Sequence, residues 1–164
     1  MLKLVSMATV LALSRAASAV PPPVVPGVDG LLALARPGRS GLVVLHFWAT
    51  WCGACRAEMP EIVRLSKELA RLDIPLVGAS LDPAAKAAAV GAFVEAQGLT
   101  FPNAILDSPD PAPVIARLDP SWNAALPATF LVTTSGKTLR AYLGPTPVER
   151  LLDDARRLSR ATRQ

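Results

Sequence analysis

Cysteine and histidine are scarce in this chain of 164 residues, which has two cysteines and one histidine. Two cysteines cannot build the framework of several disulfides that stabilises many small secreted domains. A structural zinc site needs four protein ligands, and the sequence has no second cluster of cysteine or histidine. The composition therefore excludes a disulfide-stapled scaffold and argues against a zinc module. A zinc or copper site built from Cys52, Cys55 and His46 is kept as an alternative.

Charge is also limited, at 18% charged residues and a formal net charge of +4. Lys3 and Arg15 belong to a first segment without acids, and without these two the balance is fifteen basic against thirteen acidic residues, or +2. This excess is too small to indicate a nucleic-acid-binding protein. About half of the residues are hydrophobic, so we expect one compact domain.

The N-terminal segment lacks an apolar run long enough to cross a bilayer. Its run from Leu4 to Leu13 is about half of the roughly 20 residues that a membrane-spanning helix needs. Lys3 precedes the run, and Ala17-Ser18-Ala19 follows it as an A-x-A pattern. These features predict a signal peptide over residues 1–19, cleaved after Ala19, and a periplasmic or otherwise exported protein. The alternative is an uncleaved N-terminus retained as an anchor.

The sequence VPPPVVP at 20–26 predicts an extended, proline-rich spacer outside the core, which leaves residues 27–164 for the domain. Apolar patterns in this domain alternate between strand and helix, which predicts parallel strands, and a turn at Ser135-Gly136 predicts an antiparallel hairpin. We therefore expect an α/β fold with a central mixed sheet flanked by helices. The expected order is strand 41–49, a helix that includes 62–72, strand 74–82, helix 83–98, strand 101–107, helix 111–119, a hairpin within 127–144 and a helix over 146–158.

Two helix starts carry capping signals. Asp82, followed by Pro83, is expected to cap the helix that begins there. Thr146 and Glu149 flank Pro147 with the spacing of a capping box, which predicts the start of the last helix.

The pair Cys52-Gly53-Ala54-Cys55 lies where the apolar strand gives way to a helix. Free N–H groups and the helix dipole at a helix N-terminus stabilise a thiolate, so Cys52 is expected to be the nucleophile. Cys55, one turn further along, can attack the mixed disulfide that Cys52 forms with a substrate. The spacing thus predicts a redox-active dithiol.

The segment FWATWCGACRAEMP resembles the active-site segment of the thioredoxin superfamily, and in particular of its exported TlpA/ResA-like branch. The residues that match are Trp48, Ala49, Trp51, the two cysteines, Glu58 and Pro60. The later LPATFLVTTSGKTLRAYLG resembles the cis-proline strand and hairpin of that family, so the likeness spans about 27–158 in element order. It implies a thioredoxin-like fold with a C-terminal hairpin and helix.

The same resemblance implies a monomeric thiol-disulfide oxidoreductase that needs no cofactor. Its substrates would be client protein disulfides, as in cytochrome c maturation or oxidase assembly, and a membrane-embedded thiol donor would restore the dithiol. The Leu126-Pro127 bond would be cis and face the cysteines, with Leu126 contacting the substrate. Trp51, Gly53 and Ala54 would complete the substrate surface, although the family commonly has proline at the position of Ala54.

Two further residues are candidates for proton transfer. Glu58 lies three residues after Cys55, on nearly the same helix face, and the resemblance implies a role in thiol protonation. His46 stands where thioredoxins carry a buried acid, and an imidazole there can act as a base for Cys55. An exposed first-turn acid and a neutral, hydrogen-bonded core histidine are the respective alternatives.

A thiol peroxidase is a second alternative activity. The peroxiredoxin pattern Thr-x-x-Cys is missing, because Thr50 is only two residues before Cys52. A purely structural disulfide is the remaining alternative, and a loop this short would stabilise the fold only weakly.

Overall fold

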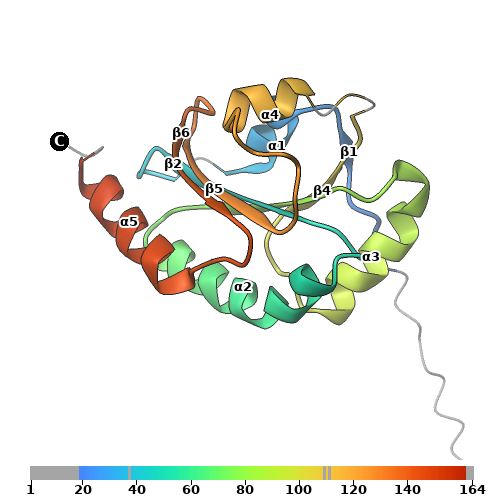
Figure 1. The fold of residues 1–164 in the computed structure, drawn as a ribbon. Coiled ribbons are helices and arrows are strands. Elements are labelled where there is room, and N and C mark those ends of the chain that lie inside the picture. Colours follow the sequence, from blue (N-terminus) through green and yellow to red (C-terminus); the bar gives the residue numbers. More distant parts are fainter. Residues whose placement is uncertain (1–18, 37, 109, 111, 162–164) are drawn as a thin grey trace, which may run out of the picture.

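A six-stranded mixed β-sheet forms the centre of the structure (Figure 1). The computed structural model describes residues 19–36, 38–108, 110 and 112–161, so the predicted signal peptide, except Ala19, lies outside the described residues. The strands are β1 Val24–Val25, β2 Leu42–Trp48, β3 Leu76–Ser80, β4 Asn103–Leu106, β5 Ala128–Thr133 and β6 Thr138–Leu143. The helices are α1 Val28–Leu34, α2 Gly53–Arg71, α3 Ala87–Ala96, α4 Ala112–Leu118 and α5 Val148–Ala161, with a short 3₁₀ helix, η1, at Ala84–Lys86.

The sheet combines parallel and antiparallel strands in the order β1-β4-β3-β2-β5-β6. Neighbours from β1 to β2 are parallel, whereas β5 is antiparallel to both β2 and β6. All seven residues of the central strand β2 are buried, as a strand covered on both faces requires. The predicted mixed sheet and C-terminal hairpin are confirmed.

Helices cover both faces of this sheet (Figure 1). One face packs against α1 and α4 through a cluster that includes Leu31, Phe47 and Val114. The other face packs against α2 and α5 through a cluster that includes Leu65 and Leu151. Within the described residues, no helix is both long and apolar enough to span a membrane.

The proline-rich segment differs from its prediction. It is extended, but Val24 and Val25 form β1 beside Ile105 and Leu106 of β4. The side chain of Val25 is buried, so this part of the segment belongs to the core and not to a spacer outside it. Pairing with β4 stabilises an extended segment that has few residues of its own to bury.

Neither predicted helix cap forms. The helical region after Asp82 begins with η1, which has no side-chain cap, and the Asp82 carboxylate instead accepts hydrogen bonds from Thr50 and Ser80. At the start of α5, the Thr146 N–H donates to Glu58 Oε2 at 2.8 Å, whereas Glu149 pairs with Arg64. In both places a partner distant in sequence replaces the local cap.

Candidate active site

Cys52 is the N-cap residue of α2, as the sequence predicted. Its Sγ atom accepts a hydrogen bond from the backbone N–H of Cys55 at 3.1 Å. The two cysteines are joined by a disulfide, with their Cα atoms 5.3 Å apart. Cys52 is 7% exposed and Cys55 is fully buried, so a reacting partner from solvent meets Cys52 first.

Pro127 follows a cis peptide bond with Leu126, which confirms the predicted geometry. Leu126 packs against the cluster of buried residues that contains both cysteines. Pro127 immediately precedes β5, whose first residue, Ala128, pairs with Phe47 of β2. The antiparallel pairing of β2 and β5 therefore brings Pro127 to the end of the sheet where α2 begins.

The surface around Cys52 is apolar and open. Trp51 is 66% exposed, although large apolar residues are mostly buried. Gly53 and Ala54 are also exposed, at the start of α2. Trp48, in contrast, is fully buried and stacks on Phe93 of α3 with ring centroids 5.2 Å apart. These surroundings leave Trp51 available for contact with another molecule.

His46 lies on β2 with no exposed surface. Its Nδ1 atom is 2.9 Å from Thr129 Oγ1, on the facing strand β5. Burial disfavours the charged imidazolium and lowers the pKa of His46 to about 3. The ring is thus neutral near pH 7, as in the alternative of a hydrogen-bonded core histidine.

Glu58 faces His46 from the first half of α2. Its Oε1 atom is 3.5 Å from His46 Nε2, and its side chain is only 11% exposed. Desolvation raises the pKa of Glu58, and the hydrogen bond from the Thr146 N–H opposes this rise. The predicted alternative of an exposed acid at the helix start is therefore wrong, because the Glu58 carboxyl is largely buried.

His46, Glu58, Thr129 and Thr146 form a closed cycle of contacts. Thr129 Oγ1, which contacts His46, also lies 2.8 Å from Thr146 Oγ1, and Thr146 N–H donates to Glu58. Neither Thr129 nor this role of Thr146 was predicted from the sequence. Thr129 lies 83 residues from His46, and only the register of β2 against β5 brings the two together.

The described residues contain no group of three or more histidine, cysteine or acidic side chains that could hold a metal ion. His46 directs its ring nitrogens toward Thr129 and Glu58. This arrangement gives no support to a metal site composed of His46 and the two cysteines.

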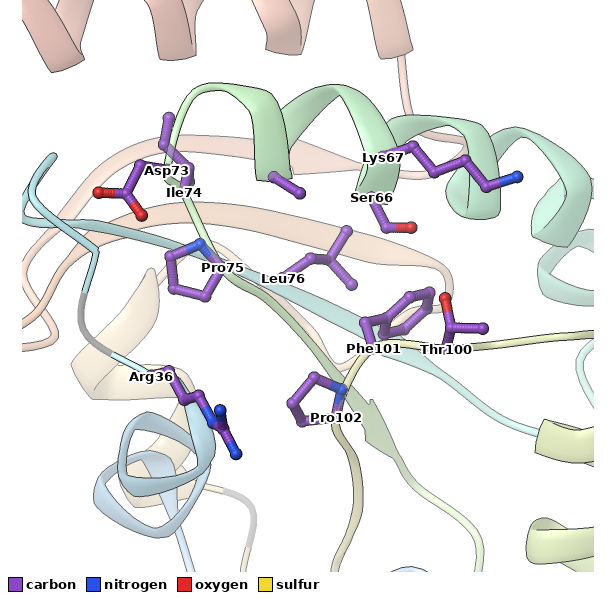
Figure 2. A pocket seen from close by; sticks show the side chains of 11 residues that line it. Arg36, Ser66, Lys67, Asp73, Ile74, Pro75, Leu76, Thr100, Phe101 and Pro102 are labelled. Carbon is purple, nitrogen blue, oxygen red and sulfur yellow. The ribbon is translucent and has the colours of Figure 1, made fainter.

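Away from the cysteines lies a hollow of about 520 Å³, and Figure 2 shows the side chains that line it. It is lined by the C-terminal half of α2, the start of β3 and the turn before β4, with Lys67, Leu76 and Phe101 among its residues. Lys67 is fifteen residues after Cys52, or roughly 20 Å along a helix axis. The hollow is therefore separate from the redox pair.

Comparison with known proteins assigns this chain to a family. The family model described as the AhpC/TSA family matches residues 32–140. The chain belongs to the AhpC/TSA family. This assignment agrees with the resemblance to thioredoxin-like proteins that the CxxC segment carries.

Relatives of the chain include a thiol:disulfide interchange protein DsbE homolog of Paracoccus denitrificans, which is 35% identical over 109 residues. The match covers 65% of this chain and 53% of that protein. The thiol-disulfide oxidoreductase ResA of Oceanobacillus iheyensis is 30% identical over 109 residues, which cover 66% of this chain and 53% of ResA. The chain thus spans about half the length of these curated relatives.

Among solved structures, the fold is similar to that of a thiol:disulfide interchange protein of the thioredoxin family from Chlorobium tepidum. The two share 22% sequence identity and a TM-score of 0.60 over 87% of this chain and 99% of that one. The thioredoxin-like fold predicted from the sequence is confirmed.

Proposed function

We propose that the protein is an exported thiol-disulfide oxidoreductase that reduces the disulfides of client proteins. The observation that carries this proposal is the Cys52-Cys55 pair at the N-terminus of α2, packed beside Leu126 and its cis proline. The names of the two curated relatives, an interchange protein and an oxidoreductase, support thiol-disulfide exchange as the chemistry.

The reaction begins with the reduced enzyme. The Cys52 thiolate attacks one sulfur of a client disulfide, which forms a mixed disulfide and releases the first client thiolate. Cys55 then loses its proton, attacks Cys52 Sγ and releases the second client thiolate. Two electrons pass to the client, which takes up two protons, and the enzyme is left with the Cys52-Cys55 disulfide.

Glu58 is the proposed acceptor of the proton that Cys55 loses. It lies one turn after Cys55 on α2, and desolvation by burial raises its pKa, which makes the carboxylate a stronger proton acceptor. His46 contributes to this step as a positioning residue, since its neutral ring lies 3.5 Å from Glu58 Oε1, the oxygen that does not accept from the Thr146 N–H. A direct role of His46 as the base is less consistent with its lowered pKa.

The proposed client surface surrounds Cys52. Trp51, Gly53 and Ala54 are exposed next to the nucleophile, whereas Leu126 is partly buried against the cluster that contains Cys52 and Pro127 is buried. An extended client segment can form backbone hydrogen bonds at Leu126 while its apolar side chains cover Trp51.

Export and electron supply complete the proposal. In an oxidising compartment the dithiol has to be restored by a dedicated reductant, for which a membrane-embedded thiol donor is the proposed source. We further propose that the protein acts as a monomer without a cofactor. Clients that belong to cytochrome c maturation or oxidase assembly are the class that the family resemblance favours.

Trapping tests the proposal directly. The variant Cys55→Ser leaves Cys52 able to form a mixed disulfide but removes the sulfur that resolves it, so client proteins should stay covalently attached and be released by dithiothreitol. The matched control Cys52→Ser should trap nothing. Absence of mixed disulfides, together with no reduction of insulin by the wild-type protein, would contradict the proposed function.

A further inference from the structure

Asp82 and Thr50 join the ends of two neighbouring strands next to the active site. Thr50 lies in the turn between β2 and α2, two residues before Cys52, and Asp82 follows β3. The Thr50 N–H donates to Asp82 Oδ2 at 2.8 Å, and the Thr50 hydroxyl donates to Asp82 Oδ1 at 2.5 Å. Both carboxylate oxygens therefore hold the same residue of the turn.

The Asp82 carboxylate is fixed as well as buried. It is only 3% exposed, and Ser80 supplies a third hydrogen bond from its hydroxyl to Oδ2 at 2.7 Å. The Asp82 N–H in turn donates to Ser80 Oγ at 3.1 Å. A buried carboxylate needs such donors to offset its desolvation, so the Asp82 side chain has little freedom to leave this position.

Backbone hydrogen bonds also restrain the turn. Its backbone contributes one internal hydrogen bond, from the Cys52 N–H to the Ala49 carbonyl at 3.2 Å. The Trp48 carbonyl, just before the turn, accepts a hydrogen bond from the Leu81 N–H at 2.8 Å, and the Cys52 carbonyl accepts one from the Arg56 N–H at 3.1 Å. Thr50 is the residue whose side chain links the turn to the segment after β3. Cys52 follows directly after Trp51, and its sulfur meets the Cys55 N–H only while it keeps the N-cap position.

We propose that Thr50 and Asp82 are positioning residues that hold Cys52 in the N-cap position of α2. This inference depends on the proposed function, because it concerns the reactivity of the same thiol. The stabilisation of a thiolate by a helix N-terminus falls off within one turn, so a small displacement of Cys52 weakens it. Loss of the Thr50 hydroxyl therefore raises the pKa of the reduced Cys52 thiol.

The other polar groups around the two cysteines are not changed by a substitution at Thr50. Glu58 and His46 lie deeper, on α2 and β2, and Arg56 is exposed on the first turn of α2. A substitution at Thr50 alters none of these three groups, whereas Thr50→Val also removes the hydroxyl donor to Asp82 Oδ1 and leaves the two donors to Oδ2. A change in the pH profile of Cys52 then reports the position of the thiol.

The test compares Thr50→Val with Thr50→Ser in the full chain. Valine has nearly the shape of threonine but lacks the hydroxyl, whereas serine retains it. The reduced proteins are reacted with iodoacetamide between pH 5 and pH 9, and modification of Cys52 is followed by mass spectrometry. We expect Thr50→Val to react about threefold to tenfold more slowly at pH 6.5, equivalent to a rise of about half to one unit in the thiol pKa. Thr50→Ser should stay within about twofold of the wild-type rate, because the thiol pKa is then preserved.

Circular dichroism of each variant confirms that it is folded, and Thr50→Ala is the second variant if Thr50→Val does not fold. A wild-type pH profile in the folded variant that lacks the hydroxyl would overturn the inference. That outcome is distinct from failure of the proposed function, which would appear as a wild-type protein that reduces no insulin and traps no client.

Discussion

The Nε2 atom of His46 and the Oε1 atom of Glu58 lie 3.5 Å apart in the interior of the protein. Neither atom has a hydrogen bond to another described residue. Burial moves the two groups in opposite directions, since it lowers the pKa of the imidazole and raises that of the carboxyl group. Both changes favour the uncharged forms. A proton that the Glu58 carboxylate accepts therefore leaves both groups uncharged.

His46 should make the fold less stable in acid. Its pKa in the folded protein is about 3, below the ordinary value of 6.5, so the unfolded chain binds the extra proton. The contribution to stability is present above pH 6.5 and is lost as the pH falls toward 3. In urea unfolding at pH 7, 5.5 and 4.5, the stability advantage of the wild type over His46→Asn should shrink as the pH falls. A difference that does not depend on pH would contradict this prediction.

Glu58 should have the opposite dependence. Its folded-state pKa lies above the ordinary value of 4.5, so the stabilising effect of its protonation is complete below pH 4.5 and is lost as the pH rises through the folded value. We expect Glu58→Gln to be more stable than the wild type at pH 7 and nearly equal to it below pH 4.5. In a protein that retains Cys55, the same substitution should slow the release of client from the mixed disulfide with Cys52, because it removes the proton acceptor.

A matched control for Glu58 lies one turn further along α2. Glu61 is 57% exposed and pairs with Arg64 on the surface. Glu61→Gln should change the free energy of unfolding by less than about 0.5 kcal/mol at either pH. Equal effects at the two positions would show that burial of Glu58 has no energetic consequence.

The two tryptophans that flank the site should separate binding from stability. Trp48→Ala removes a fully buried side chain and should cost about 3–5 kcal/mol in the free energy of unfolding. Trp51→Ala alters an exposed side chain and should change stability by less than about 0.5 kcal/mol. It should instead raise KM for insulin by roughly tenfold, since a buried aromatic contact with the client is lost. Unchanged insulin kinetics in Trp51→Ala would remove Trp51 from the client surface.

Metal and peroxide tests address the alternative activities. We expect the purified protein to contain less than about 0.1 equivalents of zinc or copper, because the alternative site has only Cys52, Cys55 and His46 as ligands and a structural zinc site uses four. Treatment with a chelator should leave the rate of insulin reduction unchanged. Reduced protein should consume hydrogen peroxide no faster than Cys52→Ser. Stoichiometric metal, or peroxide turnover that depends on Cys52, would favour the corresponding alternative.

Local patterns in the sequence were sufficient for the order of elements and for the location of the dithiol. The apolar run before Cys52 and the periodicity after it predicted β2 and α2, and Cys52 is the N-cap residue as expected. The cis bond before Pro127 could not be predicted from the residues alone, since such bonds are a small minority. That prediction required the family resemblance.

The capping predictions failed for one physical reason. Asp82 and Thr146 are residues that commonly cap helices, but both hydrogen bond to residues far away in the sequence. Thr50 is 32 residues from Asp82, and Glu58 is 88 residues from Thr146. Such pairings depend on how strands and helices are placed side by side, and a local pattern contains no information about that.

The short strand β1 affects how the folded molecule behaves at high concentration. It occupies the outer side of β4, and the Pro23 carbonyl accepts a hydrogen bond from the Ile105 N–H. The three residues before Val24 are prolines, which have no N–H group to offer to an incoming strand. This border of the folded sheet is therefore a poor template for edge-to-edge aggregation.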